Sequence, residues 1–438
     1  MIGSEIDYKS YYADRNSSSQ FKPVKKFNFF NLLQINRRQK DDFIGIPDDK
    51  ILLGSSDRDY MDAVTIPYSR KRRQTIIICG GNGSGKSVVA RVLGIDQLHG
   101  RFGHPVFAVD PKGDLHKLAM ANEIAEFRRI LYKFGINPKN YPYAKYIAPE
   151  FSDLGTSWGK RDGNEVTLCL RNIKNIENKD IRTATMMEIM KISIDEPAFF
   201  IISEIMEMDD FPIEYQEFRN AAKEIAERGG YKSERFFRSL DNLVNTRKLS
   251  DRYFDYGREL MENELLIMEG SVTSKNLAEN MSQGAIVNAA IYDIVNARIN
   301  TIRNPEGGYM RKIPLIYMEE GDVFAGKGGL SAEVMTSLST KYREIEEVPG
   351  ISTLIVVQFL HNLPEELVNE AEYILCPKLT NSKDKELLKD RDSDIYHMQD
   401  MYFNPEDRPN EWICYGRNGW NDHRRFFPIM TCTKMSQA

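Results

Sequence analysis

Residues 75–87 read TIIICGGNGSGKS. The first four are β-branched, which is typical of a buried strand, and they lead into the GxxxxGK[ST] spacing of a phosphate-binding loop. Residues 88–93 then have the pattern of a helix. A glycine-rich turn that binds nothing would lack this order of strand, complete motif and helix, so the stretch predicts a nucleotide-binding site.

The residue types of this loop suit the binding of ATP. Glycines let the backbone turn so that several N–H groups point at phosphate oxygens. Lys86 would reach the β- and γ-phosphates, and the Ser87 hydroxyl would take one place on a magnesium ion. The residues expected to contact the nucleotide are Gly80, Gly81, Asn82, Gly83, Ser84, Gly85, Lys86, Ser87 and Val88.

Composition limits the class of protein. The chain has 438 residues, which is enough for about two or three domains, and 41% hydrophobic with 28% charged residues is the balance of a soluble globular protein. The formal net charge is −5, so any contact with nucleic acid has to come from local basic patches. No apolar run is long enough to span a bilayer, and the N-terminus lacks the pattern of a signal peptide. We expect a cytoplasmic protein without an integral membrane segment.

Cysteine and histidine usage gives no sign of a structural metal or of disulfides. The six histidines are scattered, and the cysteines form no CxxC pair, which favours reduced thiols in a cytosolic compartment. The five cysteines stand far apart, at positions 79, 169, 376, 414 and 432.

Polar side chains follow three further predicted strands. Ligands bind at the carboxyl ends of strands in open α/β sheets, so these side chains are expected near the phosphate loop. A phosphate-loop hydrolase needs one carboxylate for the magnesium shell and one that orients or deprotonates the attacking water. The strands at 106–109, 313–318 and 352–357 end in Asp110, in Glu319 and Glu320, and in Gln358, respectively.

Helical periodicity is clearest in two other stretches. Apolar spacing in 215–225 predicts a helix that stops at Gly230, and a second helix is predicted over 334–345 with Arg343 near its end. The methionines of 186–190 have helical spacing and are interpreted as core packing. The predicted organisation is a flexible N-terminal extension at 1–45, a first part of an ATPase core at 46–114, a mainly helical insertion at 115–285, and a second part of the core with C-terminal strands at 286–438.

The N-terminal extension contains KKFNFFNLLQINRRQK at 25–40, with aromatic and aliphatic residues between basic ends. One reading is a helix on a membrane surface. The other is a segment that docks on its own or a neighbouring subunit, which we favour because the apolar part is short.

Four motifs together resemble the HerA and FtsK superfamily of hexameric translocases, which includes conjugative coupling ATPases and viral genome-packaging ATPases. They are IIICGGNGSGKS, FAVDPKGDL, LIYMEEGDVF and STKYREIEEVPGISTLIVVQF, and the resemblance covers roughly residues 50–115 and 285–430. It implies an α/β fold, in which a RecA-like P-loop NTPase core has a mainly parallel central sheet flanked by helices.

The resemblance also implies roles for single residues. Glu319 takes the position of the magnesium-site acid beside Ser87, Glu320 that of the catalytic base, Gln358 that of a γ-phosphate sensor, and Arg343 that of an arginine finger supplied to the neighbouring subunit. The family usually has Asp where Glu319 stands, so hydrolysis is expected to be slow or to use Asp322 as well. Conjugative coupling proteins usually begin with membrane helices. This sequence shows no apolar run of that length, which favours a soluble HerA-like or packaging motor over a coupling protein.

The leading hypothesis is a homo-hexameric ring that hydrolyses ATP and moves double-stranded DNA through a central pore, with a nuclease, a portal or a membrane protein as a further partner. Lys112, Lys117 and Lys327, in glycine-containing loops, are candidates for contact with the DNA backbone. One alternative is a secretion, conjugation or pilus-assembly ATPase that acts at a membrane. Another is a nucleotide-gated assembly protein with slow turnover, which is suggested by Glu319 at the position where the family usually has Asp.

Overall fold

The computed structural model describes residues 49–55, 63–68, 74–111, 115, 144–149, 165–269, 277–324, 330–342, 344–391, 412–416 and 424–428. The expected docking segment at 25–40, together with the rest of the N-terminal extension, lies outside these described residues.

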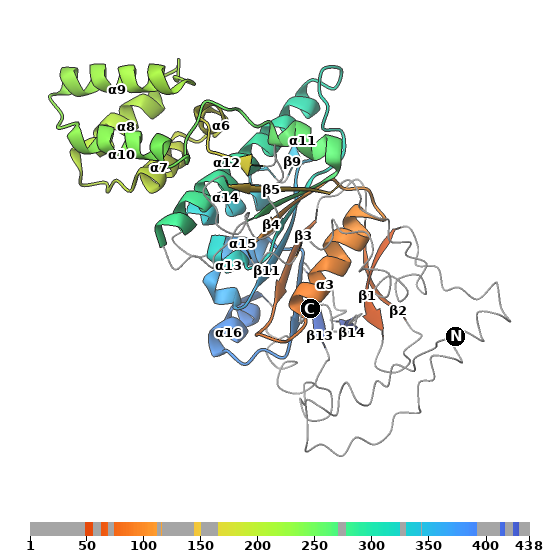
Figure 1. Cartoon of the computed structure of the whole chain (residues 1–438). Helices are drawn as coiled ribbons and strands as arrows, with labels where there is room; N and C mark the ends of the chain where they lie inside the picture. The colour runs from red at the N-terminus through yellow and green to blue at the C-terminus, as the bar shows by residue number, and fades with distance from the viewer. Residues whose placement is uncertain are drawn as a thin grey trace, which may run out of the picture.

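A 12-stranded sheet is the centre of the molecule (Figure 1). In its middle, the strand that precedes the phosphate loop pairs in parallel with a strand on either side. On one of these two sides, the parallel pairing continues toward the edge of the sheet. In spatial order these strands are β12 (Tyr373–Pro377), β3 (Thr75–Cys79), β11 (Ser352–Val357), β8 (Leu315–Met318), β4 (Val106–Asp110), β7 (Leu265–Glu269), β5 (Lys145–Pro149) and β6 (Glu165–Val166). The prediction of a RecA-like core with a mainly parallel sheet is confirmed.

The other end of the sheet is antiparallel. Each strand from β12 outward pairs with its neighbour in the opposite direction. The strands are β13 (Trp412–Gly416), β14 (Arg424–Pro428), β1 (Lys50–Ser55) and β2 (Ala63–Pro67). An antiparallel edge on a mostly parallel sheet is common in α/β proteins.

Helices cover both faces of the sheet, so the central strands are buried throughout. In β3 the side chains of Ile76 and Ile78 belong to one apolar cluster, and those of Ile77 and Cys79 belong to the other. The first cluster includes the helix after the loop and the second includes the long helix behind the sheet (Figure 1). The helices are α3 (Lys86–Arg91) continued by the π-helix η1 (Val92–His99), α12 (Leu277–Arg303), α13 (Gly321–Phe324), α14 (Leu330–Ser339), α15 (Glu365–Glu370) and α16 (Ser382–Arg391).

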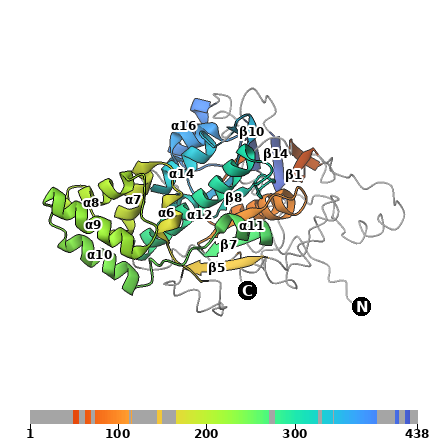
Figure 2. The ribbon, with the colours of Figure 1, turned by 90° about the horizontal axis from the view of Figure 1, so that it is seen from above.

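A helical lobe projects from one end of the sheet (Figures 1 and 2). Its predicted helix stop is confirmed, because α9 ends at Gly229 and the next residue, Gly230, caps it with a left-handed φ of 63°. Met186 and Met190 are buried in the core, as expected. The helices of the lobe are α6 (Leu170–Lys174), α7 (Lys179–Met190), α8 (Pro197–Glu207), α9 (Tyr215–Gly229) and α10 (Glu234–Asn245). The next helix, α11 (Tyr256–Asn263), packs on α12 and β7 at the end of the sheet (Figure 1).

The stretch 115–285 contributes more than a helical insertion. Its strands β5, β6 and β7 extend the central sheet, and β7 pairs directly with β4. The expected boundary at 285 falls inside α12, which begins at Leu277. The apolar run of β7, LLIME, is too short for periodicity to separate a buried strand from a helical turn.

The helix predicted over 334–345 is shorter than expected. α14 ends at Ser339, and a hairpin of β9 (Glu344–Ile345) and β10 (Val348–Pro349) follows. Glu346 and Glu347 form its turn, with φ of 52° and 65°. Tyr342 and Ile345 are buried although they lie outside the helix. Both positions are therefore apolar, and they happen to continue the helical spacing of Val334 and Leu338 in the sequence.

Glu188 in α7 provides a test of how the lobe is joined to the core. Its carboxylate faces α12, where a Cβ added at Gly284 would lie 3.7 Å from Oε1. Burial raises the pKa of Glu188 to about 7. A carboxyl whose pKa is raised by folding binds its proton more tightly in the folded state, so this group's contribution to stability is lost as pH rises from about 4.5 to 7.

Replacement of Glu188 by Gln is therefore expected to stabilise the protein at pH 8 by about 1–2 kcal/mol, after allowance for partial exposure, and to have little effect at pH 5. Thermal unfolding followed by circular dichroism at both pH values measures this. Glu224→Gln, at an exposed position in α9, is the matched control and should change neither curve. Equal curves for Glu188→Gln and the wild type at pH 8 would contradict the burial argument.

Candidate nucleotide-binding site

The phosphate loop has the backbone conformation that its glycines permit. Gly83 and Gly85 have φ of 77° and 89°, in the left-handed region that residues with a Cβ rarely adopt. The Ser84 N–H donates to the Gly81 carbonyl at 3.2 Å, which closes the turn. A Cβ at Gly80 would lie 2.5 Å from the Ser84 Oγ and 3.2 Å from the Pro377 Cδ, so a side chain there would displace the Ser84 hydroxyl.

Lys86 begins α3 and is only 5% exposed. Its ammonium lies close enough to Asp322 to lower the pKa of that carboxyl, although burial, the largest cause, raises it overall. The Lys86 side chain thus faces the strand ends from which the acidic residues emerge. This is the placement expected for a lysine that reaches a terminal phosphate.

Glu319 is 1% exposed and is held on the side of the sheet covered by α3. The Tyr317 hydroxyl donates to its Oε1 at 2.6 Å, and the Arg91 Nε lies 4.0 Å from the same oxygen. Arg91 stands four residues after Ser87, one helical turn further along α3. The Glu319 carboxylate is thus held between a hydroxyl and a guanidinium.

Glu320 follows directly with a left-handed φ of 51°, which is uncommon for a residue with a side chain. The turn that it starts is pressed against β11, because a Cβ at Gly321 would lie 2.4 Å from the Ile355 Cγ2. Asp322 comes next, and the charge of Glu320 contributes to its raised pKa. The Asp322 carboxylate therefore lies near both Glu320 and Lys86.

Asp110 and Gln358 end the strands β4 and β11. The Asp110 carboxylate is fully buried and its Oδ2 accepts the Leu115 N–H at 2.8 Å. The Gln358 carbonyl accepts the Cys79 thiol at 3.5 Å, which joins the ends of β11 and β3. The roles of Asp110 in nucleotide contact and of the Gln358 amide in sensing phosphate stay predictions.

Four predicted functional residues lie outside the part of the chain that the structure describes. They are Arg343, Lys112, Lys117 and Lys327. The residues that the structure does bring to one edge of the sheet are Lys86, Ser87, Glu319, Glu320 and Gln358, from the ends of the neighbouring strands β3, β8 and β11.

Sequence reasoning missed the side chains that support these residues. Tyr317 is two residues before Glu319, so the alternation of a strand puts both on one face, and a polar tip in an apolar strand was the available signal. Asn362 and Asp384 also lie near the site, but both are distant in sequence from the residues that they bind. No local pattern could have identified them.

The donor set fits a magnesium–nucleotide complex. Magnesium is usually held by one or two protein carboxylates, with phosphate oxygens and waters in the other places. The described residues contain no group of three or more His, Cys, Asp or Glu able to hold a metal by themselves. They do offer the Ser87 hydroxyl and the fixed Glu319 carboxylate.

A phosphate loop at the end of a central parallel strand, with acids at the end of a nearby strand of the same sheet, defines the P-loop NTPase fold. Among solved structures, VirB4 of Thermoanaerobacter pseudethanolicus is similar to this chain, with 11% identity and a TM-score of 0.52, over 90% of this chain and 100% of VirB4. This similarity confirms the expected fold, a P-loop NTPase core.

Two further solved structures are less similar to this chain. The plasmid coupling protein TrwB has 14% identity and a TM-score of 0.44, over 88% of this chain and 96% of TrwB. The genome-packaging NTPase B204 from Sulfolobus turreted icosahedral virus 2 has 7% identity and a TM-score of 0.30, over 81% of this chain and 98% of B204. No protein-family model matches the sequence, and no curated protein matches it.

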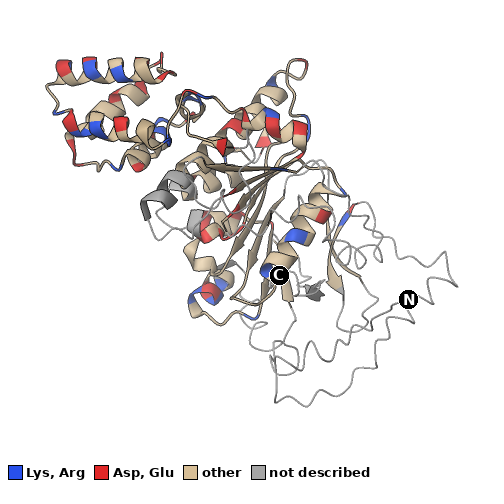
Figure 3. Cartoon of the chain, in the orientation of Figure 1, with Lys and Arg blue, Asp and Glu red and all other residues tan. Residues whose placement is uncertain are grey.

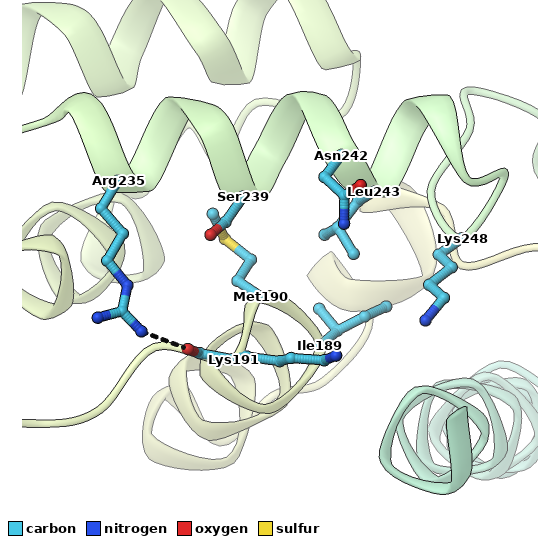
Figure 4. A pocket seen from close by; sticks show the side chains of 8 residues that line it. All are labelled: Ile189, Met190, Lys191, Arg235, Ser239, Asn242, Leu243 and Lys248. Atoms are coloured by element: carbon cyan, nitrogen blue, oxygen red, sulfur yellow. Dashed lines mark hydrogen bonds between the residues drawn. The ribbon is translucent and has the colours of Figure 1, made fainter. Parts of the chain in front are cut away.

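A separate cavity of about 240 Å³ lies in the helical lobe, between α7 and α10 (Figure 4). Arg235 donates to the Lys191 carbonyl at its rim, at 3.3 Å, and is also paired with Glu196. Since Arg235 is already occupied in this way, the cavity is less basic than its lining residues suggest. The lining residues are Ile189, Met190, Lys191, Arg235, Ser239, Asn242, Leu243 and Lys248.

The fixation of Glu319 can be tested by removing its hydroxyl donor. Tyr317 is fully buried, so Tyr317→Phe leaves the carboxylate without that hydrogen bond and should lower the free energy of unfolding by about 1–3 kcal/mol. Urea unfolding followed by circular dichroism measures the change. Tyr309→Phe, which removes a 3.3 Å bond from an exposed tyrosine to Asp255, is the matched control and should cost under about 0.5 kcal/mol. Equal losses in the two variants would show that Glu319 does not depend on Tyr317.

Proposed function

We propose that this chain is an ATP-driven DNA translocase that works as a homo-hexameric ring. The observation that carries the proposal is the arrangement at one edge of the sheet, where the phosphate loop, the acids after β8 and the amide after β11 meet. An NTPase core explains each of these groups. The assignment as a motor is supported in addition by the sequence resemblance to translocases, which implies that Arg343 is supplied to a neighbouring subunit.

The residues divide the work of hydrolysis. Backbone N–H groups of the loop and the Lys86 ammonium bind the phosphates, and Ser87 with Glu319 would hold magnesium, which neutralises charge on the phosphate oxygens. Glu320 orients the attacking water and accepts its proton. Gln358 contacts the γ-phosphate, and Arg343 from the next subunit stabilises the charge of the transition state.

DNA contact is proposed for a few loops rather than for a whole face. Basic and acidic side chains are interspersed over the helical lobe, and neither sign dominates it (Figure 3). With a net charge of −5, binding of the DNA backbone has to rely on local cations, for which Lys112, Lys117 and Lys327 remain the candidates. None of the described helices is long and apolar enough to cross a membrane. A cytoplasmic location, and a nuclease, portal or membrane protein as a partner, are part of the proposal.

ATP hydrolysis by the purified protein, with and without duplex DNA at low salt, tests the function, while light scattering gives its mass. We expect a hexamer whose turnover rises with DNA, and a loss of turnover of at least about 100-fold in Lys86→Ala, because the phosphates lose their charge partner. Lys174→Ala, at an exposed position in α6, is the control and should hydrolyse ATP as the wild type does.

An equal rate of ATP hydrolysis with and without DNA at low salt would overturn the translocase hypothesis. It would favour an ATPase that acts on a protein at a membrane. Nucleotide binding without turnover would instead favour the nucleotide-gated assembly protein. In that case Glu319→Asp, which restores the usual acid, should raise turnover strongly.

A further inference from the structure

A short segment after β11 is fixed in place from outside the nucleotide site. The 3-10 turn η3 (Leu360–Asn362) follows Gln358 closely. The Asp384 Oδ1 accepts both the His361 N–H, at 2.8 Å, and the His361 ring Nδ1, at 2.7 Å. Asp384 is 1% exposed and belongs to α16, so a buried carboxylate anchors the turn to that helix. The neighbouring residue, Asn362, is held in position as a result.

Asn362 reaches from this turn to the acidic segment after β8. Its Nδ2 donates to the Asp322 Oδ2 at 3.4 Å. The other oxygen, Asp322 Oδ1, has almost no contact with solvent, and no described residue forms a hydrogen bond with it. A buried acceptor without a partner costs about 1–3 kcal/mol, so its presence requires an explanation. A partner that arrives with the substrate provides one.

The groups around Asp322 indicate which partner this is. Glu320 and Lys86 both act on its carboxyl, the first raising and the second lowering its pKa. Asp322 thus lies among the lysine that reaches the terminal phosphate, the proposed base and the turn after Gln358. The attacking water has to occupy this region, on the far side of the γ-phosphorus from the bond that breaks.

We propose that Asp322 positions the attacking water through its Oδ1, and that Asn362 holds Asp322 in the orientation that this requires. The proposal rests on the proposed ATPase function. In the step itself the water oxygen bonds to the γ-phosphorus, the bond from that phosphorus to the bridging oxygen breaks, ADP leaves with the electron pair, and the water proton goes to Glu320. Asp322 accepts a hydrogen bond from the second water hydrogen and is neither nucleophile nor base.

A water held by two carboxylates is better oriented than one held by Glu320 alone. Orientation of a reactant contributes to the rate constant of the chemical step and leaves the binding of ATP largely unchanged. A purely structural role for Asp322 would affect folding instead. The two roles therefore differ in what a substitution changes.

The test compares Asp322→Asn, Asn362→Ala and the double variant in the full chain. For Asp322→Asn we expect kcat to fall about 10- to 100-fold, with the Kd of a fluorescent ATP analogue within about threefold of the wild type and the melting temperature not lowered. Asn362→Ala should lower kcat about fivefold with the same unchanged Kd. The double variant should be no slower than Asp322→Asn, because both changes remove one interaction. Asp195→Asn, on an exposed loop of the lobe, is the control.

A kcat within twofold of the wild type for Asp322→Asn would overturn the proposal. A loss of ATP-analogue affinity as large as the loss of kcat would also overturn it, because Asp322 would then act on binding. If Asp322→Asn does not fold, the test rests on Asn362→Ala. An unchanged kcat in that variant would then reject the proposed role of Asn362 and Asp322 in positioning the water. Absence of hydrolysis by the wild-type protein is a different outcome, which removes the proposed function itself.

Discussion

The parallel register of three strands is the constraint on which the site depends. β3 pairs with β11 so that Cys79 lies opposite Val357, and β11 pairs with β8 so that Ile355 lies opposite Met318. Because parallel strands end at one edge, this register brings the phosphate loop, Gln358 and the acids after β8 to the same level. The Gly80 N–H donates to the Val357 carbonyl at 3.2 Å, so the pairing extends into the loop itself.

Burial of charge at this edge is balanced differently for each acid. Glu319 is paired with a hydroxyl and a guanidinium, and Asp384 accepts two hydrogen bonds from His361. Asp322 accepts one side-chain hydrogen bond, of 3.4 Å from Asn362, and its Oδ1 has no hydrogen-bond partner among the described residues. A buried carboxylate is costly unless it is fully hydrogen-bonded. Asp322 is the incompletely satisfied acid of the three, which is why we propose that the attacking water completes its environment.

Much of the fold could be predicted because it depends on local signals. β-branched runs gave the strands β3 and β11, and the glycine pair at 229–230 gave the end of α9. β7 was missed because five apolar residues carry no usable period, and the length of α14 was overestimated because Tyr342 is buried outside a helix. In the candidate site, the phosphate-loop motif predicted Lys86, and an apolar strand that ends in acids predicted Glu319 and Glu320. The bond from Asn362 to Asp322 spans 40 residues and arises only when the sheet is assembled.

The helical lobe shares its core with the sheet. One apolar cluster includes Ile77 of β3, the buried face of α12, and Phe236 and Leu240 of α10. Polar contacts strengthen the same junction, since the Asp293 carboxylate of α12 accepts from the Asn175 amide and from the Tyr256 N–H. A domain with a core of its own could rotate on a linker, but this lobe could do so only by exposing apolar surface. Any movement driven by the nucleotide is therefore expected first in the segments at the strand ends, where Asn362 of η3 is bonded to Asp322.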